Sequence, residues 1–172
     1  MTTDQIILAV QSSTANVFST MLGVEIVAEP PHTVKSCPPI NNEVMAFVGL
    51  SGPWVGSGVI TCTAEFACRL CELFLMTETP ALNEEVLDAI GELANMIIGN
   101  FKTAAEAVVG PLGLSVPTVI YGRNFVSKSV GSSNWIIMPF TCGKDTFEVR
   151  LWFACVAESS TGRIPSAQTL AA

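Results

Sequence analysis

Charged side chains are scarce in this chain: Asp, Glu, Lys and Arg make up 13% of its 172 residues, while apolar residues make up 49%. Only eight residues are basic, and the net charge is -7. Nucleic acid and anionic membranes are bound through basic patches, so the composition excludes both as expected partners. Scarce charge also leaves apolar surface, which favours self-association.

Histidine and phosphate-binding motifs are scarce as well. The one histidine, His32, follows two prolines, so a Ser-His-Asp triad or a His-rich metal site is poorly supplied. No G-x-x-x-x-G-K-[ST] loop occurs, and we interpret Gly52, Gly56 and Gly58 as turn glycines. The sequence therefore does not supply the usual groups of an independent hydrolase.

The six cysteines are spread through apolar segments and do not form a compact disulfide framework. Cys68 and Cys71 have CxxC spacing, but no second pair follows at zinc-finger spacing and no thioredoxin-type strand precedes them. We interpret both as core residues of a helix.

Long hydrophobic runs are missing too. No stretch reaches the roughly 18 apolar residues of a membrane span, and the N-terminus lacks the positive flank of a signal peptide. We therefore expect a cytoplasmic protein that does not bind membrane. The length suits one domain, which we place at residues 1–157, followed by a flexible Ser/Thr/Ala-rich tail over residues 158–172.

The apolar periodicity predicts three helices and six strands that occur in clusters. The helices are expected at residues 4–22, 64–76 and 83–109, and the strands at 24–28, 44–50, 57–63, 114–121, 135–142 and 146–157. Clustered elements favour an α+β sandwich of long helices on an antiparallel or mixed sheet. The order helix, strand, loop and hairpin occurs twice, which predicts pseudo-duplicated halves.

The helix predicted over residues 83–109 has one apolar and one polar side at about 100° per residue. The apolar arc contains Val86, Ile90, Leu93, Ala94, Ile97, Phe101, Ala104 and Ala105. The opposite stripe contains Asp88, Glu92, Asn95, Gly99, Lys102 and Glu106. We expect the apolar arc to be buried and the stripe to face solvent or a partner.

Two glycines and two apolar residues distinguish this stripe from the ordinary solvent-exposed face of an amphipathic helix. Gly91 and Gly99 each cost about 1 kcal/mol relative to Ala in a helix, which indicates that another surface approaches closely. Met96 and Ile98 flank the stripe and could seal a docked surface. Two other interpretations remain open: a solvated face whose glycines pack against a neighbouring element, or a divalent cation held by oxygen ligands.

The pattern Asp88-x-x-x-Glu92-x-x-Asn95, followed by Pro117 in LSVPTVI, resembles the signature of the CheC/CheX/FliY chemotaxis phosphatases. It is most similar to the CheX branch, because the chain carries one clear copy of the motif. The segments GELANMIIGNFK and MLGVEIV agree with the same family, and the resemblance covers residues 5–157. It implies a CheX/CheC-like sandwich that acts as a phosphatase.

The resemblance also implies roles for individual residues. Asn95 would orient the water that attacks the aspartyl phosphate of a CheY-like response regulator, and Glu92 would pair with the regulator's phosphate-contacting lysine. Asp88 would contribute to docking. Gly91, Met96, Ile98, Gly99 and Lys102 would contact the same partner. No cofactor of the chain's own is expected, because the regulator supplies the Mg²⁺.

A non-enzymatic alternative is a CheX-like module that binds a receiver domain or another signalling partner without hydrolysis. In either case the resemblance implies a homodimer that forms through the sheets. At the matching place in the first helix stand Ser13 and Asn16, so the Asn is present and the Glu is missing. We therefore expect the first half to be structural.

Overall fold

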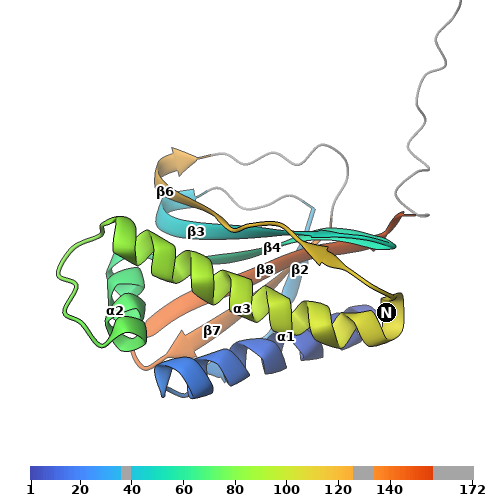
Figure 1. The fold of residues 1–172 in the computed structure, drawn as a ribbon, viewed down its shortest axis with the longest axis horizontal. Helices are drawn as coiled ribbons and strands as arrows, with labels where there is room; N and C mark the ends of the chain where they lie inside the picture. Colours follow the sequence, from blue (N-terminus) through green and yellow to red (C-terminus); the bar gives the residue numbers. More distant parts are fainter. Residues whose placement is uncertain (36–39, 126–133, 157–172) are drawn as a thin grey trace, which may run out of the picture.

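The computed structural model describes residues 1–35, 40–125 and 134–156, and within them three helices lie on one face of an eight-stranded sheet (Figure 1). The helices are α1 (Thr3–Val17), α2 (Ala64–Leu75) and α3 (Glu84–Val109), and α1 continues into a π-helical turn, η1 (Phe18–Leu22). All strand pairs are antiparallel. The predicted α+β class is confirmed.

The strands are β1 (Val27–Ala28), β2 (His32–Val34), β3 (Ile40–Ser51), β4 (Trp54–Thr63), β5 (Gly113–Leu114), β6 (Thr118–Phe125), β7 (Trp135–Cys142) and β8 (Asp145–Cys155). The sheet order is β1-β7-β8-β4-β3-β5, with β2 also paired to β7 and β6 also paired to β3. At one edge, β1 and β2 of the first half pair with the β7–β8 hairpin of the second half. At the other edge, β5 and β6 of the second half pair with the β3–β4 hairpin of the first half. The sheet thus has the predicted pseudo-duplication.

Helix starts are set by local side chains. Thr2 forms a capping box with Gln5 before α1, and Thr63 accepts a hydrogen bond from the Phe66 amide at the start of α2. Asn83 accepts from the Val86 amide at 2.9 Å and begins α3. Each of these hydrogen bonds joins residues three positions apart, so the signal for the start of each helix lies in the neighbouring sequence.

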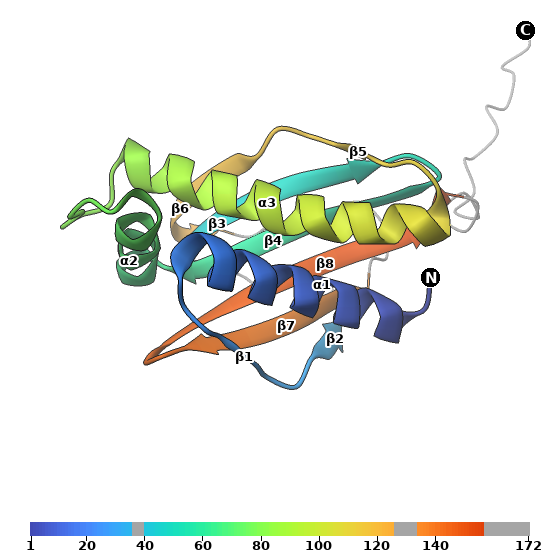
Figure 2. The same cartoon turned by 60° about the horizontal axis from the view of Figure 1, so that its bottom comes forward.

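The main core lies between the sheet and the helices. Alternate residues of each strand point toward α1 and α3, which run side by side across the sheet (Figure 2). Near α2, the Phe147 ring stacks on Phe18 at 4.7 Å and on Phe140 at 5.1 Å. A smaller cluster containing Met45, Val59, Trp135 and Ile137 lies on the opposite face of the sheet. None of the helices in the described ranges is long and apolar enough to cross a membrane.

Several boundaries differ from the prediction. Strands β3 and β4 are joined at Gly52 and Pro53, so Gly56 and Gly58 lie within β4 instead of in a turn. A Cβ at Gly56 would collide with the Trp152 carbonyl oxygen of β8, so the glycine permits close strand pairing. The predicted strand over residues 24–28 is limited to β1. Cys37 and the predicted tail lie outside the described residues.

Candidate functional site

Helix α3 places its apolar arc on the sheet. The buried residues are Val86, Ile90, Leu93, Ala94, Ile97, Phe101 and Ala105, as predicted; Ala104 is exposed. The helix begins beside α2 and crosses the sheet next to α1 (Figure 2). Its 26 residues thus form one rigid element whose outer side is available for a site.

Glu92 and Asn95 lie together on this outer side. Glu92 is exposed and Asn95 is half-buried, and three residues along a helix bring two side chains to the same face. Neither side chain has a hydrogen bond or ion pair with any other residue in the described ranges. A carboxylate and a carboxamide are therefore both available to an external group. Asp88, one turn before Glu92, is exposed as well.

Gly91 is buried, and the surface that approaches it closely is part of this chain and not of a partner. A Cβ at Gly91 would lie 3.1 Å from Val119 Cγ2 and 3.6 Å from Pro117 Cβ. The glycine therefore lets β6 pack tightly against α3, and the prediction that it contacts a partner is wrong. Pro117 lies directly before β6, in the segment that packs against this side of the helix.

Ile98 is also a core residue, with 0% of its surface exposed. A Cβ at Gly58 would lie 2.6 Å from Ile98 Cγ1, so the side chain fills the space that this glycine leaves on β4. The prediction that Ile98 flanks a docking surface is therefore wrong. The buried arc of α3 is wider than expected, because β4 and β6 both reach under this side of the helix.

The far end of the stripe is engaged within the chain. The Lys102 ammonium lies 2.9 Å from Glu106 Oε1, which also accepts a hydrogen bond of 2.8 Å from the Leu112 amide. This backbone donor, helped by Lys102, lowers the pKa of Glu106. Gly99 has only Leu114 Cδ1 near a Cβ position, at 3.7 Å. The predicted partner contacts of Lys102 and Gly99 stay predictions, as does that of the half-buried Met96.

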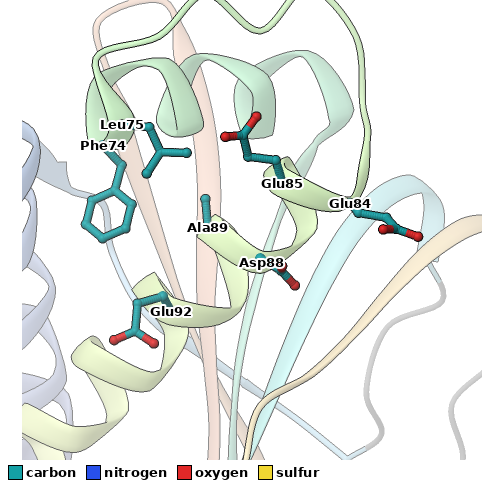
Figure 3. Close-up of a pocket in the computed structure, with 7 residues that line it drawn as sticks. All are labelled: Phe74, Leu75, Glu84, Glu85, Asp88, Ala89 and Glu92. Atoms are coloured by element: carbon teal, nitrogen blue, oxygen red, sulfur yellow. The ribbon is translucent and has the colours of Figure 1, made fainter.

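The near end of the stripe borders a groove of about 530 Å³ between the end of α2 and the first turns of α3 (Figure 3). It is lined by Phe74, Leu75, Glu84, Glu85, Asp88, Ala89 and Glu92. The sequence alone did not indicate this groove, because it depends on how α2 packs beside α3. Glu92 belongs both to the groove and to the pair with Asn95.

The first half of the fold does not present an equivalent pair. Asn16 is exposed on α1, but Ser13, at the position that corresponds to Glu92, is only 7% exposed. This burial agrees with the expectation that the first half is structural. In the described part of the chain, no group of three or more His, Cys, Asp or Glu side chains is placed to hold a metal ion.

Known proteins share both the sequence and the fold. Residues 44–141 match the family described as chemotaxis phosphatase CheX. A protein from Thermotoga maritima named CheY-P phosphatase CheX is 29% identical over 128 residues, which cover 74% of this chain and 82% of the relative.

Solved structures agree over most of the chain. A CheC-like superfamily protein from Shewanella sp. PV-4 has a TM-score of 0.77 and 26% identity, covering 89% of this chain and 99% of that one. A chain in the crystal structure of the CheX-CheY-BeF3-Mg²⁺ complex from Borrelia burgdorferi has a TM-score of 0.73 and 26% identity, covering 86% and 97%. The similarity thus extends well beyond the matched family segment.

Proposed function

Because this chain belongs to the CheX family of chemotaxis phosphatases, which it matches over more than half of its length, we propose that it hydrolyses the aspartyl phosphate of a CheY-like response regulator. The name of the Thermotoga maritima relative supports this reaction, and the Borrelia burgdorferi complex supports a CheY partner. The observation that carries the proposal is the placement of Glu92 and Asn95, accessible and unpaired among the described residues, on one face of a rigid helix.

In this proposal, Asn95 enters the regulator's phosphorylated pocket and orients the attacking water. A carboxamide can donate one hydrogen bond and accept another, so it can fix both the position and the direction of a water molecule. Phosphoryl transfer depends mainly on such in-line positioning and on charge stabilisation. The regulator supplies the Mg²⁺ and the groups that bind the phosphate, so no cofactor of this chain is proposed.

Glu92 anchors the complex in the same proposal. Its exposed carboxylate has no cation to pair with among the described residues, and it would pair with the lysine that contacts the regulator's phosphate. Asp88 adds a second negative charge one turn away. The proposed setting is the cytoplasm, and the proposed assembly is a homodimer.

The experiment uses a CheY-type receiver domain that has been phosphorylated with acetyl phosphate in the presence of Mg²⁺. The loss of its phosphate is followed over time with and without this protein. We expect the wild-type protein to accelerate the decay and Asn95→Ala to lose about 100-fold or more of that acceleration while remaining folded, as measured by circular dichroism. Binding without any acceleration by the wild-type protein would favour the non-enzymatic module and refute the proposed reaction.

A further inference from the structure

The groove beside the catalytic pair exposes apolar surface that the proposed mechanism does not use. Leu75 is 40% exposed at the end of α2, and the next residue, Met76, is 93% exposed with a backbone φ of 54°. Phe74 and Ala89 complete the apolar part of the lining (Figure 3). Apolar surface costs roughly 25 cal/mol per Å² in water, so a groove of this kind is stabilised when a second apolar surface covers it.

The remaining lining of the groove is entirely acidic. Glu84, Glu85, Asp88 and Glu92 contribute four carboxylates from three successive turns of α3, and none forms an ion pair with a residue in the described ranges. The positive N-terminus of the helix accounts for Glu84 and Glu85, which lie in its first turn. It does not account for Asp88 and Glu92, which lie beyond that turn. All four carboxylates carry negative charge, so this end of α3 favours a partner surface that carries a cation.

We propose that this groove docks a segment of the response regulator that lies beside its phosphorylated pocket and carries a basic residue next to an apolar one. The basic side chain lies beside Glu85 and Asp88, while Glu92 pairs with the phosphate-contacting lysine, and the apolar side chain packs on Phe74 and Leu75. The identity of the partner rests on the proposed function. The chemistry of the segment rests on the groove, which is apolar toward α2 and negative along α3.

The position of Glu92 links the two sites. It lines the groove and also stands three residues from Asn95, so a regulator seated on Asn95 extends over the groove. Glu85 precedes Glu92 by seven residues, which is about 10 Å along a helix. This distance lies well within the footprint of one protein interface. The groove therefore sets affinity, and it leaves the chemistry to Asn95.

This division of roles predicts that Glu85→Lys raises KM for a phosphorylated CheY-type receiver domain at least about tenfold, because it replaces an attraction with a repulsion. The turnover number kcat stays within about twofold, because Asn95 is unchanged. Leu75→Ser raises KM as well, without changing the charge. Asp4→Lys is the matched control: it makes the same change in charge on α1, at the end away from α2 (Figure 1), and leaves KM unchanged.

Thermal unfolding of each variant shows whether it is folded, and Glu85→Gln replaces Glu85→Lys if the lysine variant is not. A wild-type KM in the folded Glu85 and Leu75 variants would overturn the docking proposal and leave the proposed reaction standing. Titration of the same receiver domain, loaded with beryllofluoride, separates the two proposals further. Weaker binding by Glu85→Lys, together with no hydrolysis by the wild-type protein, would support the docking groove and refute the phosphatase activity.

Discussion

The contact between Ile98 of α3 and Gly58 of β4 gives a quantitative test of how the functional helix is held on the sheet. Ile98→Ala removes a fully buried side chain, and such truncations cost about 2–5 kcal/mol of unfolding free energy. Gly58→Ala adds a methyl group within 2.6 Å of Ile98 Cγ1, so we expect a cost of about 1–3 kcal/mol from overpacking.

The double variant should lose less stability than the sum of these two costs. The methyl group at position 58 enters the space that Ile98→Ala vacates, so the two changes compensate by at least about 1 kcal/mol. Urea unfolding measures the free energy of unfolding of the two single variants, the double variant and the wild-type protein, and the comparison holds if the slope m is the same for all four. Val108→Ala is the control, because Val108 is 58% exposed on the same helix and should change the unfolding free energy by less than about 0.5 kcal/mol. Strictly additive costs would contradict the described contact.

Three further predictions concern the glycines of α3, its far end and the assembly. Gly91→Val should lower the midpoint of thermal unfolding, because Val119 Cγ2 already lies 3.1 Å from a Cβ position at Gly91. Gly99→Ala should raise the midpoint by a few degrees, because the nearest atom lies 3.7 Å away and Ala favours a helix over Gly. The reverse order of the two midpoints would contradict the packing described for β6. Folding lowers the pKa of Glu106, so its contribution to stability is present at neutral pH. This contribution declines as the pH falls below the pKa of an unfolded glutamate, about 4.3, and is lost once the pH has passed the lowered pKa of the folded state. The stability difference between the wild-type protein and Glu106→Gln, measured by urea unfolding, should therefore narrow in acid; a difference independent of pH would refute this effect. Light scattering should give twice the monomer mass at micromolar concentration, and a monomer would refute the proposed homodimer.

Local sequence signals predicted the elements that carry the site. Thr63 and Asn83 cap their helices through hydrogen bonds to residues three positions away, so the start of α2 and of α3 could be predicted from the sequence. The helical period likewise placed Glu92 and Asn95 on the outer side of α3. These features depend on neighbours along the chain, and the structure agrees with them.

The sequence could not give the depth to which α3 is covered. A helical wheel assigns an angle to Gly91 and Ile98, but it contains no information on how far β4 and β6 reach around the helix. The glycines of β4 show the same limit. Gly58 was interpreted as a turn residue, because a missing side chain is as typical of a turn as of a strand under close contact. The groove at Phe74 was missed because it arises only when α2 packs beside α3.

The most direct test of the account compares Asn95→Ala with Asn100→Ala in single-turnover experiments at saturating protein. Asn100 is an exposed asparagine on the same helix, five residues and therefore about 140° away from Asn95. We predict that Asn95→Ala slows the loss of phosphate from the bound receiver domain by about 100-fold or more with little change in its dissociation constant, while Asn100→Ala behaves as the wild-type protein. A wild-type rate of phosphate loss in the Asn95→Ala complex would contradict the central claim.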